Sequence, residues 1–471
     1  MSTEELEGPE VRATSRRLDV ALVVAGFIGF CALILSHGTA LLEPDDYAYR
    51  ASIIALSHGE ILLTNAQYAV LQHLTSVQQW HHMASGFWIS EKNPGYPFLG
   101  VLFYMVGLLR FTPLVFGAIG VTGLFWGANR WLGRPAGALA VGLYLTSGAA
   151  LTFAWRATMP SFTDASLIAG GAGWLLWALL SPERSRLRQW IGLLAFICLA
   201  LAVFIRYTNI LELLVAVVVV AATAKPARLG AQAIVVWSFA VGIALGALGL
   251  FDTWVYGHAT ATGYSAGEIT FSVSALWPNL KGMPGQWTTS MTFWVVALAS
   301  LIGVMVQVLR HRKDFTARRD ATVVGGLSLG WLGLWFLYLN YTWTANMLGG
   351  EHGGPGGPGG GATVQVIRFY LPALGLAALV AAWLLTKIPR AAAAGILGVL
   401  AVTGVLSFHS MASTHPGGFG GPPNGGGSHP PTGVTGQPQR GGGTKGIPSQ
   451  GQIPGDGHHP EGRGPDGDGN H

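Results

Sequence analysis

The sequence predicts an all-α, polytopic membrane protein, and three observations support this fold class. Of its 471 residues, 50% are hydrophobic and 10% are charged, whereas soluble domains carry about a quarter charged residues. The apolar residues occur in uncharged runs of roughly seventeen or more, which is long enough for a helix to span a bilayer. The pI is 9.2, which alone would be compatible with nucleic-acid binding. The basic residues, however, lie in short loops between apolar runs, where they determine the orientation of membrane helices.

About eleven apolar segments are predicted to be membrane helices. They cover residues 18–36, 111–129, 136–154, 164–181, 190–205, 208–224, 230–251, 289–309, 321–340, 368–386 and 391–408. Segment 97–109 is apolar but short, so we expect an interfacial or re-entrant helix there. Residues 1–17 are then a cytoplasmic tail and 18–408 the transmembrane domain. Residues 409–471, rich in Gly and Pro, are predicted to be a disordered extracytoplasmic tail.

The distribution of basic residues predicts the orientation. With a cytoplasmic N-terminus, the inner loops hold 17 of the 27 Lys and Arg residues, most densely in RHRKDFTARR at 310–319. The prediction is a multi-pass protein of the plasma membrane with its C-terminal tail outside. The first apolar run, 20–36, is longer than the core of a signal peptide and lacks a small-x-small cleavage site, so we interpret it as a retained anchor. The longer loops 37–96, 252–288 and 341–367 then face outward, and interfacial helices are expected in the first of them.

The stretch EPDDYAYR, residues 43–50, places three carboxylates directly after the first apolar run. A capped interfacial helix would explain them, because Pro44 suits a first helical turn and acidic residues there complement the helix dipole. Asp46 and Arg50 are also spaced i, i+4 and able to pair. The position favours a functional role, because ionisable groups held against the membrane are costly and tend to be kept for a task.

Other polar residues fall on the same predicted side of the membrane: Arg156, Asp164, Arg206, Glu212 and Arg368. Each has a structural alternative. Arg156 and Asp164 are placed to pair with each other, Arg206 to extend toward the interface, and Glu212 to pair within the bundle. Because all five residues lie on the same predicted side of the membrane, the sequence nevertheless predicts an outward-facing polar site.

Four segments resemble the motifs of the GT-C glycosyltransferases, the class that includes protein O-mannosyltransferases and lipid A aminoarabinose transferases. They are EPDDYAYRAS (43–52), NPGYPFLGV (93–101), FDTWVYGHATATGYSAG (251–267) and RFYLPALGLAAL (368–379). Their order and their side of the membrane agree with the family over residues 20–390. Asp252 stands where the family often has Asn, and the Gly-rich insertion 353–361 departs from the family pattern.

The resemblance implies a cell-envelope glycosyltransferase, a hexosyl- or pentosyltransferase similar to the mannosyltransferases. Nucleotide sugars are made in the cytoplasm, and the sequence shows no soluble nucleotide-binding domain or Gly-rich phosphate loop. An outward-facing site is therefore expected to take its sugar from a polyprenyl phosphate, with inversion at the anomeric carbon. The acceptor hydroxyl would belong to a protein, a lipid or a polysaccharide. Membrane lipids are expected partners, and nucleic acid is not.

Two roles remain open for the carboxylates. Asp45 or Asp46 is the predicted catalytic base that accepts the acceptor's proton, or both hold Mg²⁺ or Mn²⁺ through their oxygens. Arg368 is the first candidate for the leaving phosphate, because a guanidinium matches phosphate oxygens in a fork. The full set of predicted substrate-binding residues is Arg368, Arg206, Arg156, Asp164, Tyr370 and Tyr264.

Two other functions are compatible with the composition. A multi-pass transporter or lipid flippase would have similar helices, but transporters usually place polar sites near the middle of the membrane and show internal repeats. A non-catalytic scaffold for envelope assembly would leave the outer charged cluster unexplained. The polar residues at the helix ends favour the transferase.

Overall fold

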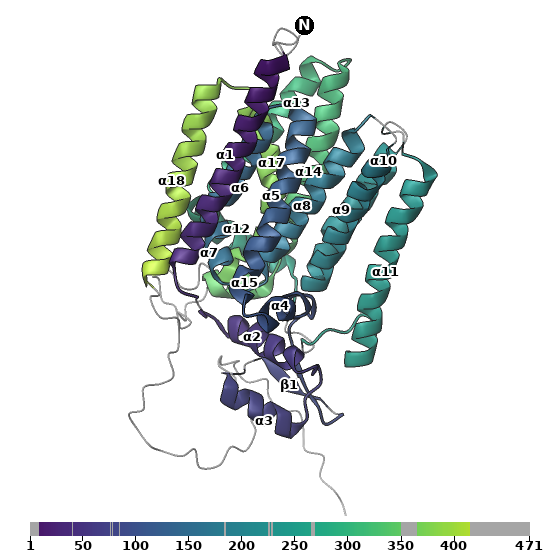
Figure 1. Cartoon of the computed structure of the whole chain (residues 1–471), viewed down its shortest axis with the longest axis vertical. Helices are drawn as coiled ribbons and strands as arrows, with labels where there is room; N and C mark the ends of the chain where they lie inside the picture. The colour runs from purple at the N-terminus through teal and green to yellow at the C-terminus, as the bar shows by residue number, and fades with distance from the viewer. Residues whose placement is uncertain are drawn as a thin grey trace, which may run out of the picture. The chain divides into compact units, whose positions relative to one another are not determined.

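The structure is a computed structural model that describes residues 9–414 except 40, 76, 78, 84, 183–184, 225–226, 228, 265–268 and 350–364. It is a bundle of helices with a small hairpin (Figure 1). The elements are α1 (Pro9–Ser36), α2 (Pro44–Ser57), α3 (Asn65–Leu74), β1 (Trp80–His82), β2 (Trp88–Ser90), α4 (Gly95–Met105), η2 (Leu109–Phe111), α5 (Thr112–Leu132), α6 (Ala136–Leu145), α7 (Gly148–Trp155), α8 (Ser161–Leu180), α9 (Arg186–Ile205), η3 (Tyr207–Asn209), α10 (Ile210–Thr223), α11 (Ala231–Tyr256), α12 (Val273–Ser290), α13 (Trp294–Arg310), α14 (Phe315–Leu339), α15 (Thr342–Gly349), η4 (Leu371–Ala373), α17 (Leu374–Leu385) and α18 (Arg390–Thr414).

Among the described residues, seven helices are long and apolar enough to cross a membrane, and two bent helix pairs raise this number to at most nine. The pairs are α6–α7, bent by 59°, and α12–α13, bent by 105°. The predicted count of eleven is therefore not confirmed. The predicted spans 208–224 and 368–386 coincide with shorter apolar helices, Tyr207–Thr223 and Leu371–Leu385. The chain is a mostly helical, multi-pass membrane protein.

The first outer loop contains the helices that the sequence predicted there, and the second contains a helix that it did not predict. Loop 37–96 holds α2, α3 and an antiparallel hairpin in which Trp80 lies opposite Ser90. Loop 252–288 contains most of α12, which has Pro278 and Pro284 inside it. Proline usually ends a helix, because it removes a backbone hydrogen bond and clashes with the preceding turn, so this helix was missed.

The ends of the predicted domains also shift. α1 begins at Pro9, inside the predicted tail 1–17, and α18 continues to Thr414, six residues into the predicted disordered tail. The remainder of that tail and the Gly-rich insertion 353–361 lie outside the described residues.

Two helices at the centre of the bundle, α5 and α8, contact each other through glycine. A Cβ on Gly123 would lie 2.4 Å from the carbonyl oxygen of Gly170, and one on Gly127 would lie 2.4 Å from that of Gly173. Small residues allow membrane helices to approach backbone to backbone, where packing rather than the hydrophobic effect holds them together. This contact fixes α8, whose first turn contributes to the polar cluster described below.

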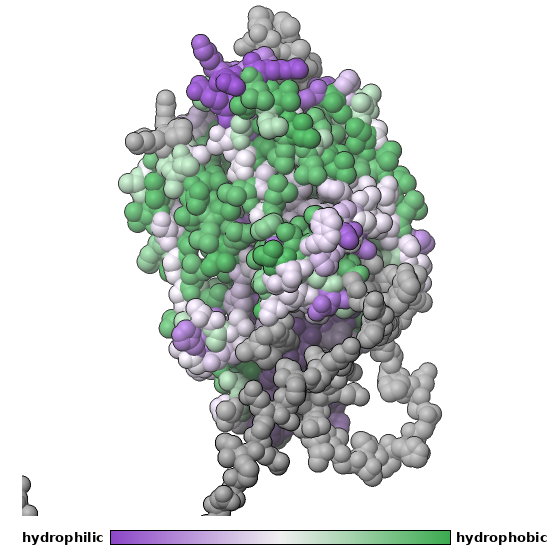
Figure 2. Space-filling view, turned by 180° about the vertical axis from the view of Figure 1, so that it is seen from behind, coloured by the Kyte–Doolittle hydropathy of each residue, from purple (hydrophilic) through white to green (hydrophobic). Residues whose placement is uncertain are grey.

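The outer surface of the bundle is apolar. Figure 2 shows a broad hydrophobic surface over the helices and a group of hydrophilic residues at one end. Large apolar side chains such as Leu22, Val235 and Val402 are exposed on α1, α11 and α18. Such a broad apolar surface is expected of a protein surrounded by lipid.

Candidate active site

The acidic stretch begins α2 at one end of the bundle (Figure 1). Glu43 is the N-cap residue, and Pro44 occupies the first turn, as the sequence predicted. The Asp46 side chain accepts hydrogen bonds from the backbone N–H groups of Leu42 (3.0 Å) and Glu43 (3.1 Å). These bonds satisfy donors that a helix start leaves free, so Asp46 has a local role in fixing α2.

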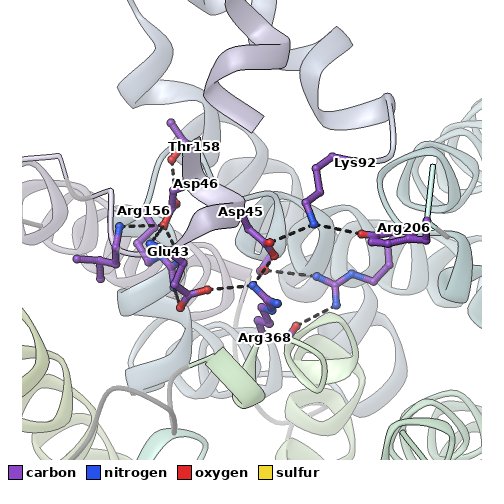
Figure 3. A network of polar contacts seen from close by, with 11 residues as sticks. Glu43, Asp45, Asp46, Lys92, Arg156, Thr158, Arg206 and Arg368 are labelled. Atoms are coloured by element: carbon purple, nitrogen blue, oxygen red, sulfur yellow. Dashed lines mark hydrogen bonds and ion pairs between the residues drawn. The ribbon is translucent and has the colours of Figure 1, made fainter. Parts of the chain in front are cut away.

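Most of the predicted site residues meet in one polar cluster, drawn in Figure 3, although they come from distant parts of the chain. Acids come from the start of α2 and the first turn of α8, and cations from the segments after β2, α7 and α9 and before η4. The members are Glu43, Asp45, Asp46, Asp164, Lys92, Arg156, Arg206 and Arg368.

One part of the cluster is fully enclosed. The Arg156 guanidinium donates to Glu43 at 2.8 Å and to Asp46 at 2.5 Å, and the side chains of Arg156 and Asp46 are both 0% exposed. Thr158 donates to the other Asp46 oxygen at 2.9 Å. Burial raises the pKa of Asp46, and the charge of Arg156 opposes that shift. We call Glu43, Asp46, Arg156 and Thr158 the buried clamp, because they tie α2 to the turn between α7 and α8.

The other part keeps some contact with the outside. Asp45 is 13% exposed and lies between two cations, Lys92 Nζ at 3.0 Å and Arg368 Nη1 at 2.5 Å. Arg368 Nη1 also contacts Glu43 at 2.9 Å, so this guanidinium joins the two parts of the cluster (Figure 3). Burial would raise the pKa of Asp45, but the charges of Arg368 and Lys92 outweigh it and hold that pKa well below its usual range.

This shift predicts how the stability of the protein depends on pH. A carboxyl whose pKa is lower in the folded state stabilises the fold above its unfolded pKa, and the contribution is lost as the pH falls toward the folded pKa. We expect the difference in melting temperature between wild type and Asp45→Asn to be constant from about pH 6 to 8. It should shrink below about pH 4, near the ordinary pKa of Asp. Thermal unfolding in detergent across this pH range measures it, and a difference that grows on acidification would contradict the assignment.

Arg206 forms the wall of the cluster next to α8. Its Nε lies 3.3 Å from Asp164, and its Nη1 donates to the carbonyl of Arg368 at 3.2 Å. Asn209 also donates to Asp164, at 2.5 Å. The Phe369 ring lies 5.5 Å from the Arg206 guanidinium and 4.8 Å from that of Arg368, so it packs against both.

The local pairings considered from sequence differ from those observed. Asp46 binds Arg156 rather than Arg50 on its own helix, and Asp164 binds Arg206 rather than Arg156. Each acid pairs with a cation that the fold brings from another segment. Glu212 is buried, and its Oε1 has no hydrogen-bond partner among the described residues.

The two predicted tyrosines lie in different surroundings. The Tyr264 hydroxyl is 3.4 Å from Lys92 Nζ, and Lys92 lies over its ring at 5.1 Å, so Tyr264 borders the cluster. Tyr370 is 0% exposed and packs among the rings of Trp287, Trp335 and Tyr338. Its position indicates a role in packing rather than direct contact with substrate.

Two members of the cluster were not predicted as site residues, Glu43 and Lys92. Glu43 belongs to the acidic stretch itself. Lys92 is the only Lys or Arg between Arg50 and Arg110 and directly precedes the NPGYPFLGV segment. That isolation was the signal that could have identified it.

The donor set does not fit a divalent metal ion. The two Asp45 oxygens already face Lys92 and Arg368, and Asp46 faces Arg156 and Thr158. A cation between the two aspartates would lie close to three fixed positive charges, and its favoured oxygen ligands are already engaged. Across the described part of the chain, no group of three or more His, Cys, Asp or Glu residues could hold a metal.

Comparisons with solved structures show similarity to two membrane enzymes. ArnT from Cupriavidus metallidurans in the apo state is 17% identical with a TM-score of 0.50, over 86% of this chain and 66% of ArnT. AglB, the oligosaccharyltransferase of Archaeoglobus fulgidus, in complex with an inhibitory peptide and a dolichol-phosphate, is 11% identical with a TM-score of 0.50, over 87% of this chain and 57% of AglB. The apo form of the Archaeoglobus fulgidus oligosaccharyltransferase gives a TM-score of 0.51 at 11% identity, over 86% of this chain and 57% of the other.

The chain thus spans 57–66% of the length of these structures. No protein-family model matches it, and no curated protein matches it in sequence. ArnT and AglB are both membrane glycosyltransferases of the GT-C superfamily. The similarity extends over most of this chain, and the chain has the GT-C fold.

Proposed function

We propose that this protein is a glycosyltransferase that moves a sugar from a polyprenyl-phosphate donor to an acceptor hydroxyl, with inversion at the anomeric carbon. The observation that carries the proposal is the placement of Asp45, partly exposed and held between Lys92 and Arg368. A carboxylate beside fixed cations supplies the two groups that the reaction requires, a base for the acceptor and positive charge for the leaving phosphate.

The cations beside Asp45 are suited to a phosphate. Lys92 and Arg368 contact the partly exposed Asp45, and Arg206 lies beside Arg368 and donates to its backbone carbonyl. The side chains of Arg206 and Arg368 are 13% and 11% exposed. An arginine can bind two phosphate oxygens in a fork, and fixed cations stabilise the negative charge that grows as the sugar leaves. The dolichol-phosphate bound to AglB supports a lipid phosphate as the donor group. Arg156 is enclosed in the buried clamp, so we assign it to holding Glu43 and Asp46 in place rather than to binding phosphate.

The bonds formed and broken in the proposed reaction, and the proton that is transferred, can each be assigned. The acceptor oxygen forms a bond to the anomeric carbon while the bond from that carbon to the phosphate oxygen breaks. The hydroxyl proton goes to Asp45, and the lipid phosphate leaves with the electron pair. A single displacement of this kind inverts the anomeric configuration.

Binding of the donor would itself activate Asp45. Burial raises the pKa of this carboxyl, and Arg368 and Lys92 lower it. A phosphate that binds these cations competes with Asp45 for them, which weakens their effect on its pKa. The carboxylate becomes a stronger base when the donor is present, so proton transfer is coupled to donor binding.

The proposed site faces the extracytoplasmic side of the plasma membrane, with the N-terminus cytoplasmic and the C-terminal tail outside. The α2 end of the bundle and the turn between α13 and α14 lie at opposite ends (Figure 1). That turn belongs to the segment 310–319 with five basic residues, which favours a cytoplasmic position. Residues 18–408 form the proposed catalytic membrane domain.

Replacement of Arg368 tests the phosphate role. Arg368→Gln is expected to lower kcat/KM by about 10²–10³, the usual cost of removing one donor that stabilises transition-state charge. Arg368→Lys keeps the charge but loses the fork, so an intermediate loss is expected. The measurement is the initial rate of transfer from a panel of polyprenyl-phosphate hexoses and pentoses to membrane acceptors.

Lys281→Gln is the matched control, because Lys281 is exposed and packs against Trp277 rather than the cluster. It should transfer sugar as the wild type does. An Arg368→Gln protein with unchanged kinetics would refute the phosphate role. A transporter or flippase predicts a different result, movement of a solute or lipid across vesicles that contain the purified protein, with no new glycosidic bond.

A further inference from the structure

A large cavity lies between α8, α10 and α14, and none of the residues of the polar cluster lines it. Its volume is about 960 Å³. On α10 it is lined at positions 212, 215, 216, 219 and 223, a spacing that puts these residues on one helix face. The middle of the cavity is apolar, with Leu175, Leu179, Val215, Val219, Val323 and Leu327 in its walls.

One end of the cavity is basic. Arg130, Arg318 and Arg319 line it there. Arg318 and Arg130 are exposed, and Arg319 contacts Asp320 at 3.2 Å. Asp320 is 1% exposed and already accepts bonds from Trp131 and Trp383, each at 3.0 Å. Among the described residues at this end, the three arginines outnumber this buried acid, so positive charge is in excess at the rim.

Glu212 and Gly330 line the opposite end. Glu212 is 4% exposed, and its Oε1 has no partner among the described residues. Gly330 lies twelve residues after Arg318 on α14, a separation of about 18 Å along the helix. This length is close to the hydrocarbon depth of one leaflet, which is half of about 30 Å.

The chemistry of the walls indicates what fills the cavity. Water remains where several polar groups hold it, so it suits the Glu212 end and the arginine rim. It is disfavoured along the apolar middle section, where a hydrocarbon chain would bury the leucine and valine side chains. The basic rim selects a negatively charged headgroup.

We propose that this cavity binds an anionic phospholipid. Its phosphate headgroup contacts Arg130, Arg318 and Arg319, and one hydrocarbon chain extends along α8, α10 and α14. The site is separate from the cluster around Asp45 and does not depend on the proposed transferase activity.

The test uses the full-length protein in nanodiscs of phosphatidylcholine with phosphatidylglycerol as the anionic probe, followed by native mass spectrometry. We expect wild type to retain phosphatidylglycerol in preference to phosphatidylcholine. Arg318→Gln combined with Arg319→Gln should lower phosphatidylglycerol retention by more than about tenfold, since each basic residue near lipid headgroups contributes about fivefold. Arg318→Gln alone, at an exposed position, should lower it by about fivefold and avoids the Arg319–Asp320 contact.

Arg312→Gln combined with Lys313→Gln is the matched control. It removes the same charge from the same segment, at exposed positions that do not line the cavity, and should leave the preference intact. Ala216→Leu fills the apolar section, and should lower retention of both lipids without changing the preference for charge. Any one of three results would overturn the proposal. Wild type could retain both lipids equally, the two double variants could lose phosphatidylglycerol equally, or inorganic phosphate alone could displace the lipid.

Discussion

Asp45→Asn is expected to lower sugar transfer by about 10²–10⁴, the usual contribution of a positioned general base. Asparagine has the shape of aspartate but cannot accept the acceptor's proton. The fold should remain, because Glu43 still pairs with Arg368 and the buried clamp is untouched. Single-turnover transfer with saturating lipid donor measures the chemical step separately from donor binding.

Two variants complete this experiment. Asp45→Glu keeps a carboxylate but moves it by about one bond length, so partial activity is expected. Arg50→Gln changes an exposed residue on the same helix and should transfer sugar at the wild-type rate. If Asp45→Asn keeps wild-type transfer, Asp45 is not the base and the proposed function loses its main support.

Loss of Arg156 should have the largest effect on stability. Arg156→Gln removes the charge that pairs with both Glu43 and Asp46, which are 5% and 0% exposed. Breaking a buried ion pair from one side costs about 3–5 kcal/mol, because the remaining charge has no compensation. We expect a strongly lowered melting temperature in detergent and poor accumulation in the membrane.

A double-mutant cycle tests whether this loss of stability comes from the contact between Arg156 and Asp46. Asp46→Asn should destabilise the protein through the same contact, and Asp46→Asn with Arg156→Gln should cost less than the sum of the two single changes. The folded fraction of Asp46→Asn should still transfer sugar, unlike Asp45→Asn. Additive losses, or an Asp46→Asn protein that is fully stable but inactive, would show that Asp46 acts in the chemistry instead.

The sequence predicted most of the membrane helices but could not distinguish the two aspartates. Uncharged runs define the helices well, because few soluble structures tolerate them, and α12 was missed because of its internal prolines. Successive residues on a helix point about 100° apart, so Asp45 and Asp46 face different partners. Those partners, Lys92 and Arg156, come from other segments of the chain, and their approach depends on tertiary packing.

The contacts of Tyr370 and Lys92 could not be predicted from the sequence for the same reason, because they also depend on tertiary packing. Tyr370 follows directly after Arg368 and Phe369, so its sequence position suggests the site, yet its ring is directed into an aromatic core. Lys92 is the only Lys or Arg in a long segment and reaches Asp45 only because the chain before α4 folds back on α2. Position in a motif identifies a neighbourhood, whereas the direction of each side chain determines which residues can touch a substrate.

The glycine contact between α5 and α8 limits how substrates can reach the site. Because the two backbones touch at Gly123 and Gly170, these helices have no room to slide or tilt against each other. Asp164 and the Arg206 that it holds are therefore attached to a rigid floor. Any widening that admits the proposed lipid-linked donor must therefore come from elements other than α5 and α8.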